Sequence, residues 1–153
     1  EIADIYKGSR SETGELCGVF KDEVMGPLTK NTPCGVFGSV TNNEIRGTQV
    51  PVAMKYEVEI GKAEIISTID GNTPQRFEVE ITRLYLKNKD TKGMAITVTD
   101  PELLNATGGI IQGMSGSPII QNGMLVGAVT HVLVDDPTKG YGIFAQTMLE
   151  AAR

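Results

Sequence analysis

Residues 117–130 read SPIIQNGMLVGAVT, and this short stretch decides the fold class. Two apolar runs, PII and MLVGAV, flank the dipeptide Asn122-Gly123. Asn-Gly is the dipeptide preferred at the centre of a type I′ turn, whose twist matches that of two antiparallel strands. The stretch therefore predicts a β-hairpin built from two apolar strands.

Strand patterns recur on the N-terminal side of this hairpin. The strongest covers residues 50–60, where apolar residues alternate with other residues at a period of two, which predicts a half-buried strand. Lys62 to Ile69 predicts a second strand, which the turn cluster Asp70-Gly71-Asn72 closes. Further alternation and short apolar runs predict strands at residues 16–20, 35–40, 77–82, 94–99 and 141–145.

Helix signals are few. Asp100-Pro101 combines an N-cap residue with proline at the first helical position, and Gly108-Gly109 predicts the end of that helix after one or two turns. Residues 147–153 predict a short terminal helix. About nine strands, with a turn signal every ten residues or so, predict an all-β sandwich or barrel.

The composition is that of one soluble globular domain. The chain has 153 residues, of which 22% are charged and 40% are hydrophobic, so it is too apolar to be disordered. A net charge of -5 argues against nucleic acid as a partner, because no basic stripe is available to bind phosphates. No apolar stretch approaches the roughly 20 residues that span a bilayer. The first residue is Glu1, and we expect a processed form or a piece of a longer protein.

The sequence gives little support for metal or thiol chemistry. His131 is the one histidine, and Cys17 and Cys34 are the two cysteines, so the thiols cannot make a four-ligand zinc site. Neither CxxC nor HExxH occurs, and we expect no metal and no cofactor. The cysteines could pair if the protein is exported, whereas burial as two small hydrophobic residues is the favoured alternative.

The densest cluster of small residues is GGIIQGMSGSP at residues 108–118. Glycines on both sides of Ser115 permit a sharp turn and the close approach of another molecule, which a nucleophilic serine requires. The backbone N–H groups of Gly113, Met114 and Ser115 would then form an oxyanion hole. The lipase motif GxSxG does not fit, because Ser117 stands at its last glycine position. An ordinary glycine-serine loop is the competing interpretation.

Residues 113–118, followed by a hairpin that ends in Gly127-Ala128-Val129-Thr130, are similar to the active-site segment of chymotrypsin-like serine peptidases. The longer stretch 107–132 closely resembles the stage IV sporulation protein B (SpoIVB) peptidase family of endospore-forming bacteria. Further segments that fit this family are Asn31-Thr32-Pro33, residues 35–38, Pro51-Val52-Ala53, Lys92-Gly93-Met94, Asp136-Pro137-Thr138 and Gly140-Tyr141-Gly142.

The resemblance implies an all-β, chymotrypsin-like double β-barrel, truncated at its N-terminus and carrying one or two short helices. Residues 1–153 would be part of a serine peptidase domain, without the family's upstream PDZ domain and membrane-associated segment. The implied enzyme is exported to the space between forespore and mother cell, where it cleaves itself and a regulatory membrane protein. That cleavage leads to activation of a late sporulation sigma factor. Ser115 matches the family's nucleophile, and Asp100 matches the acidic residue of its triad.

The family's catalytic histidine lies in an upstream Gly-Ala-Leu-Gly-His type motif that this sequence does not contain. A serine hydroxyl is a poor nucleophile without a base at hydrogen-bond distance. Either the chain begins after that histidine, which we favour, or this relative has lost it. Thr130 and His131 are predicted to line the substrate cleft, and a structural role or a role as the base are the alternatives for His131. Lys92 or Lys139 could also approach Ser115 in space.

Asp100 has a competing structural explanation, because Asp before Pro is a standard helix N-cap. The leading functional hypothesis is a serine endopeptidase that acts on protein or peptide substrates and is inactive as this chain alone. The alternatives are a noncatalytic β-barrel that binds a peptide at a strand edge, and a pseudopeptidase that regulates a related enzyme. If the first barrel stays open, its exposed strand edges would favour a homodimer or a domain swap.

Overall fold

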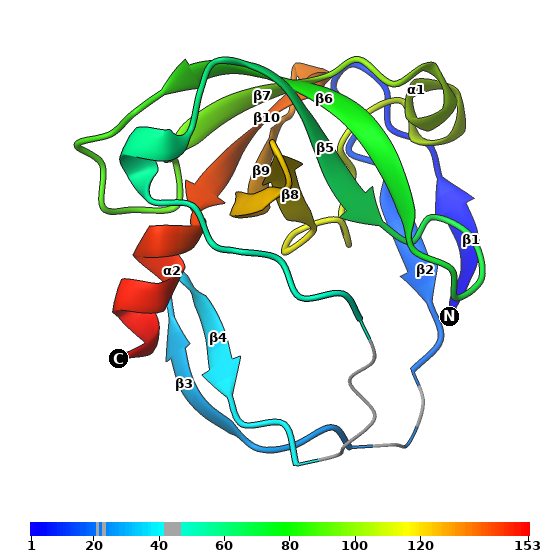
Figure 1. Ribbon diagram of the computed structural model, residues 1–153. Helices are drawn as coiled ribbons and strands as arrows, with labels where there is room; N and C mark the ends of the chain where they lie inside the picture. Colours follow the sequence, from blue (N-terminus) through cyan, green and yellow to red (C-terminus); the bar gives the residue numbers. More distant parts are fainter. Residues whose placement is uncertain (21, 23, 42–46) are drawn as a thin grey trace.

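A closed antiparallel β-barrel forms the centre of the computed structural model, which describes residues 1–20, 22, 24–41 and 47–153 (Figure 1). Its strands close in the order β10-β7-β6-β5-β8-β9, and each is antiparallel to its neighbours. Their bounds are β5 (Gly61–Ser67), β6 (Gln75–Leu84), β7 (Met94–Val98), β8 (Pro118–Gln121), β9 (Met124–Leu133) and β10 (Asp136–Phe144). The all-β prediction is confirmed.

Alternating side chains of these strands fill the barrel. In β6, Phe77, Val79 and Ile81 are buried, whereas the residues between them face solvent. Val79 lies opposite Ala63 of β5 and Val98 of β7, and both of these side chains are buried as well. Removal of this apolar surface from water, at about 25 cal/mol per Å², is the main favourable contribution to the stability of the barrel.

The hairpin between β8 and β9 turns as the sequence predicts. Asn122 has φ 52° and Gly123 has φ 76°, so both central residues are left-handed, as a type I′ turn requires. The strands predicted near residues 62–69, 77–82, 94–99 and 141–145 correspond to β5, β6, β7 and the end of β10.

The strand predicted at residues 50–60 is wrong. This segment is an extended connection that makes one parallel bridge, between Val52 and Leu125, and then enters a short 3-10 helix, η1 (Lys55–Glu57). The carboxylate of Glu57 accepts a hydrogen bond from the backbone N–H of Met54 at 2.7 Å, which stabilises the turn. Alternation failed as a signal because the buried residues here are Ala53 and Val58, while Tyr56 is 81% exposed.

Two hairpins precede the barrel and lie outside it (Figure 1). The first joins β1 (Ile2–Tyr6) to β2 (Glu15–Gly18), and the second joins β3 (Leu28–Thr32) to β4 (Gly35–Gly38). β2 and β4 match the predicted strands at residues 16–20 and 35–40, whereas β1 and β3 were not predicted. One closed barrel and two separate hairpins therefore stand where the resemblance implied a double barrel.

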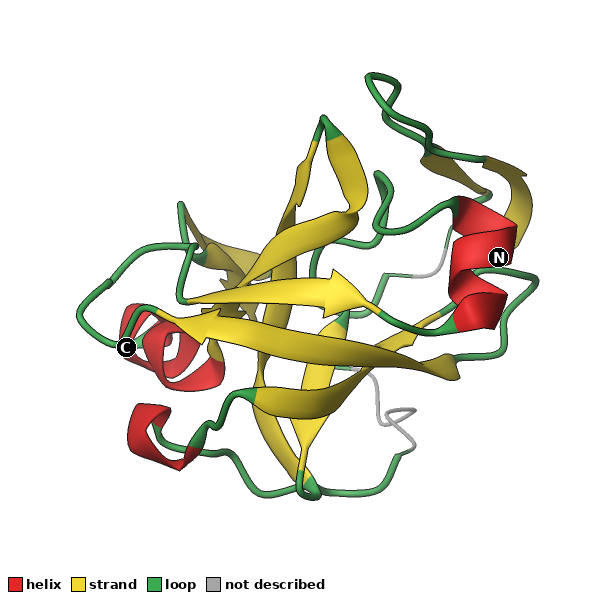
Figure 2. Ribbon diagram, turned by 90° about the horizontal axis from the view of Figure 1, so that it is seen from above, coloured by secondary structure: helices red, strands yellow, loops and turns green. Residues whose placement is uncertain are grey.

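Two α-helices flank the barrel on opposite sides (Figures 1 and 2). α1 (Pro101–Thr107) begins at the predicted Asp100 cap and ends at Gly108, whose φ is 79°. α2 (Ala145–Ala152) begins two residues before the predicted terminal helix. Within the described residues, no helix is long and apolar enough to cross a membrane.

We expect Phe77→Ala to lower the free energy of unfolding by about 3–5 kcal/mol, because it opens a cavity in the barrel core. Glu80→Ala, on the solvent face of the same strand, should change it by less than about 0.5 kcal/mol. Denaturant titration of the two variants measures both values. A loss below about 1 kcal/mol for Phe77→Ala would contradict the core assignment.

Candidate active site

The loop that carries Ser115 starts at the C-terminal end of α1. Thr107 is fully buried, and its hydroxyl lies 2.9 Å from the carbonyl of Leu103 and 2.6 Å from the carbonyl of Gly109. The carbonyl of Thr107 accepts a hydrogen bond from the N–H of Gly8 at 2.8 Å. The end of the helix is therefore tied both to the loop and to the connection between β1 and β2.

Backbone hydrogen bonds hold the loop from two further directions. The N–H of Gln112 donates to the carbonyl of Gly14, and the N–H of Leu16 donates to the carbonyl of Gln112, each at 2.9 Å. On the other side, the N–H of Ile110 donates to the carbonyl of Pro137 at 2.7 Å. The first hairpin and the start of β10 thus fix the approach to Ser115.

Ser115 is exposed, and it follows the buried residue Met114. Gly113 has φ 94°, a left-handed conformation that favours glycine, and the side chain of Met114 is fully buried in the core. The N–H of Met114 donates to the carbonyl of Ile111 at 3.2 Å, so it is not free to bind an oxyanion. Among the described residues, the N–H groups of Gly113 and Ser115 have no hydrogen-bond acceptor. These two groups remain as the candidate oxyanion donors.

The hydroxyl of Ser115 points to β9. Its Oγ donates to the carbonyl of Thr130 at 3.2 Å. Thr130 is positioned in turn by its own hydroxyl, which lies 2.8 Å from the carbonyl of Thr91 and 3.1 Å from the carbonyl of Tyr141. The structure therefore brings together Ser115, the predicted nucleophile, and Thr130, a residue predicted to line the cleft.

Two cavities open beside Ser115. The larger, of about 450 Å³, extends toward the β3–β4 hairpin and α2. Its lining residues are Pro33, Cys34, Gly35, Val36, Thr91, Ser115, Gly116, Ala128, Val129, Thr130, His131, Ile143 and Met148. The smaller, of about 290 Å³, lies on the side of the loop and the end of β9. Its lining residues are Thr13, Ile110, Ile111, Gln112, Ser115, Thr130, His131, Val132 and Val134.

None of the candidate bases His131, Lys92 and Lys139 is hydrogen-bonded to the Ser115 hydroxyl. His131 is exposed and lines both cavities, but the Ser115 hydroxyl donates to the Thr130 carbonyl instead. The Lys92 ammonium lies over the Tyr141 ring, 5.1 Å from its centroid. The Lys139 ammonium forms an ion pair with Asp136 at 2.8 Å. Neither lysine lines a cavity beside Ser115.

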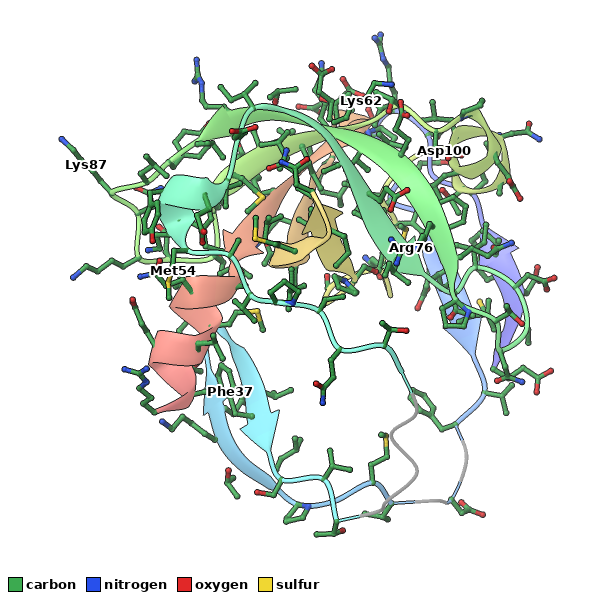
Figure 3. The ribbon with its side chains drawn as sticks, in the orientation of Figure 1. Phe37, Met54, Lys62, Arg76, Lys87 and Asp100 are labelled. Carbon is green, nitrogen blue, oxygen red and sulfur yellow. The ribbon has the colours of Figure 1, made fainter. Side chains whose placement is uncertain are left out.

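Asp100 makes the contacts of a helix cap. Its Oδ1 accepts hydrogen bonds from the N–H groups of Glu102 and Leu103, at 2.9 and 3.0 Å. Its Oδ2 accepts a third from the N–H of Glu78 on β6, at 3.1 Å. Figure 3 shows Asp100 beside α1, and it lines neither cavity at Ser115. The structure does not bring it together with the serine.

Asp135 lies in the turn between β9 and β10, and Asp136 is the first residue of β10. Hydrogen bonds from the side chains of Lys139 and Thr138 hold the pKa of Asp136 at about 2. Asp136 is therefore engaged by residues of its own strand.

The cysteines are both free and half-buried. Burial raises the pKa of the Cys17 thiol, and the carboxylates of Glu15 and Asp4 raise it further. Within the described part of the chain, no group of three or more histidine, cysteine or acidic side chains could hold a metal ion.

The barrel, the hairpins and the serine loop define the chymotrypsin-like class of protease folds. The active form of the Rv3671c protease from M. tuberculosis is similar over 90% of this chain, with a TM-score of 0.61 and 16% sequence identity. The inactive form of the same protease is similar over 82%, with a TM-score of 0.56 and 17% identity. This chain covers 61% and 64% of those two chains, which is less than two thirds of their length.

Comparison of the sequence with protein-family models identifies the family. The model of the family described as SpoIVB peptidase S55 matches residues 1–149, and the chain belongs to that family. No curated protein matches the chain. The family resemblance drawn from the stretch at residues 107–132 is confirmed.

Sequence reasoning missed the residues that reach Ser115 from distant segments. Pro33, Cys34, Gly35 and Val36, at the turn of the β3–β4 hairpin, line the larger cavity together with Thr91 and with Met148 of α2. The signal that could have pointed there is Asn31-Thr32-Pro33, which fits the family but carries no side chain typical of catalysis.

We expect Asp100→Asn to lower stability by about 1 kcal/mol, because asparagine keeps the cap but turns an N–H toward the N–H of Glu78. The peptidase rate of the full parent protein then separates the two roles. A cap alone leaves the rate within a few-fold of the unchanged protein, whereas orientation of the catalytic histidine predicts a loss of roughly 10⁴-fold. Glu102→Gln, on the exposed side of α1, is the matched control for both measurements.

Proposed function

We propose that this chain carries the nucleophile and the oxyanion donors of a serine endopeptidase. One observation supports this most. Ser115 is exposed, and the backbone N–H groups of Gly113 and of Ser115 itself have no hydrogen-bond acceptor among the described residues. Membership of the SpoIVB peptidase family makes a peptide carbonyl the natural ligand of these groups.

In the proposed reaction, Ser115 Oγ attacks the carbonyl carbon of the scissile peptide bond while a base accepts the hydroxyl proton. Negative charge develops on the carbonyl oxygen, where the N–H groups of Gly113 and Ser115 stabilise it. One such donor contributes roughly 10²–10³-fold to the rate in a related type of site. The base returns the proton to the leaving amine as the C–N bond breaks, and water then hydrolyses the acyl-enzyme.

We assign the base to a histidine outside these 153 residues, since no imidazole or lysine amine in the described part of the chain is hydrogen-bonded to the Ser115 hydroxyl. The cavity of about 450 Å³ beside Ser115, between β9 and the β3–β4 hairpin, leaves room for an imidazole at the hydroxyl. In free enzymes the catalytic hydrogen bonds are often long, so the Ser115–Thr130 contact does not exclude this arrangement.

The family resemblance supports a more specific biological proposal. The parent protein would act after export, in the space between forespore and mother cell, associated with the membrane through a segment outside these residues. It would cleave itself and a regulatory membrane protein, and thereby lead to activation of a late sporulation sigma factor.

A second candidate is a pseudopeptidase or noncatalytic peptide-binding barrel. The observation in its favour is the hydrogen bond of Ser115 Oγ to the Thr130 carbonyl, in a chain whose one histidine does not contact that hydroxyl. Sequencing the parent gene upstream of Glu1 separates the two candidates, because a Gly-His motif there supplies the missing base.

We expect a fluorophosphonate probe to label the full parent protein at Ser115, since an activated serine displaces the fluoride and forms a stable phosphonyl ester. Peptide mapping by mass spectrometry locates the adduct. Ser115→Ala should abolish labelling, and Ser117→Ala, in the same loop, should retain it. Absence of labelling in the parent protein would favour the pseudopeptidase.

The 153-residue chain alone should not hydrolyse peptides at an enzymatic rate. With the oxyanion donors but no base, we expect at most roughly 10³–10⁴-fold over the rate in water, as in an enzyme that lacks its triad. A fluorogenic peptide assay of the isolated chain and of the parent protein compares the two. Ser115-dependent turnover by the isolated chain would identify His131 or a lysine as the base.

A further inference from the structure

Positive charge gathers where β6 leads into β7. Residues 83–93 hold four basic side chains against one acid, Asp90, which gives this segment a net charge of +3 in a chain whose net charge is -5. We call this segment the basic loop, and its basic residues are Arg83, Lys87, Lys89 and Lys92. All four are exposed, and Figure 3 shows Lys87 pointing away from the barrel.

The four cations have no acidic partner within the described part of the chain, where none of them forms an ion pair. Basic residues on the outer faces of β5 and β6 do form such pairs, Lys62 with Glu78 at 3.4 Å and Arg76 with Glu64 at 2.7 Å. The basic loop therefore presents positive charge that an acidic partner can neutralise.

Hydrogen bonds hold the basic loop in one shape. The N–H of Asn88 donates to the carbonyl of Tyr85 at 2.9 Å. Asp90 Oδ1 accepts from the N–H of Lys92 at 2.9 Å, so the one acid of the segment is engaged within it. From η1, the Lys55 ammonium donates to the carbonyl of Asn88 at 3.3 Å. A loop that is already ordered loses less conformational entropy when it binds a partner.

One end of the basic loop belongs to the wall beside Ser115. Thr91 lines the cavity of about 450 Å³, and its carbonyl accepts a hydrogen bond from the Thr130 hydroxyl at 2.8 Å. Lys89 and Lys87 lie two and four residues before Thr91, so their backbones are at most roughly 14 Å from it. A polypeptide held at Ser115 therefore has its neighbouring residues within reach of these two ammonium groups.

We propose that the basic loop binds an acidic segment of the protein substrate, close in sequence to the cleaved bond but outside the cavity at Ser115. This inference rests on the proposed peptidase function. In an extended chain, aspartate or glutamate roughly three to six residues from the cleaved bond spans the distance to the loop. Opposite charge speeds the encounter and selects against basic partners. The place of Thr91 in the cavity wall favours a substrate over a membrane surface, which would need no connection to Ser115.

The first test profiles cleavage of a library of peptides of varied sequence by the full parent protein, with mass spectrometry of the products. We expect aspartate and glutamate to be enriched about twofold or more, relative to the library, at positions three to six residues from the cleaved bond. Lys87→Gln combined with Lys89→Gln should remove this enrichment and leave the preference next to the bond unchanged. Equal enrichment in parent and variant, or none in either, would overturn the inference.

Lys62→Gln combined with Arg76→Gln is the matched control. It removes the same charge from the outer faces of β5 and β6, and neither residue lines the cavity at Ser115. The control should keep the acidic enrichment. Loss of the enrichment here as well would mean that the overall charge of the protein selects acidic peptides, which also contradicts the proposal.

A binding measurement reads the basic loop without catalysis. In the Ser115→Ala parent protein, fluorescence anisotropy should show binding of labelled hexaglutamate that weakens as salt is raised. Adding the two substitutions at Lys87 and Lys89 should weaken it by about threefold or more. Lysine-dependent binding to phosphatidylglycerol vesicles, without binding of hexaglutamate, would assign the loop to a membrane and overturn the proposal.

The same measurements separate the two proposals from each other. Fluorophosphonate labelling of the unchanged parent protein at Ser115, without binding of hexaglutamate, rejects the basic loop as a substrate site and leaves the peptidase function standing. Binding of hexaglutamate without labelling rejects the peptidase function, and with it the assignment of the acidic partner as a substrate.

Discussion

The pairing of Val129 with the serine loop is the constraint on which the site depends. Gly116 and Ser117 bond to the two backbone groups of Val129, at 2.8 and 2.9 Å, in place of a further β8 residue. The loop is thereby joined to the barrel wall, with Met114 buried beneath it and Ser115 exposed above it. The same pairing ends the β8–β9 ladder, so β8 does not pair with the residues of β9 that follow Val129. The barrel thus positions the exposed Ser115 hydroxyl and the loop that carries the N–H groups of Gly113 and Ser115.

The strands of the barrel could be predicted because their local pattern and their burial agree. Phe77, Val79 and Ile81 alternate in sequence and point inward in the structure, and Asn122-Gly123 has the backbone conformation that its residue types favour. Residues 50–60 alternate just as clearly, yet no strand partner extends the single bridge at Val52. Alternation reports which residues share a face of an extended chain, whereas a strand also needs a neighbour. β1 and β3 were missed for the converse reason, because partners form them without a clear apolar face.

The candidate site also contains residues that the sequence could predict and residues that it could not. Ser115 could be found from the sequence because the features that expose a serine, glycines and a following hairpin, are adjacent in the chain. The walls of its two cavities could not, since they come from residues 13, 33–36, 91 and 148 as well as from β9. Asp100 is the opposite case, because the sequence suggested a catalytic role for a residue that makes the contacts of a helix cap. It matches the acidic residue of the family's triad, while its three backbone hydrogen bonds are those of a cap that also ties α1 to β6.

Different parts of the chain form the stable core and hold the Ser115 loop in place. The buried hydrophobic residues begin at Ala53, and within the described part of residues 1–50 Ile5 and Leu16 only pack against that core. Large apolar side chains of the same part are exposed, Phe20 at 96% and Val24 at 78%. Two-stranded hairpins are marginal on their own in water, so the first hairpin depends on its backbone bonds to Thr107 and Gln112. A substitution in that hairpin would therefore loosen the Ser115 loop without unfolding the barrel. In this arrangement the barrel provides the stable core, and the first hairpin determines how firmly the loop before Ser115 is held.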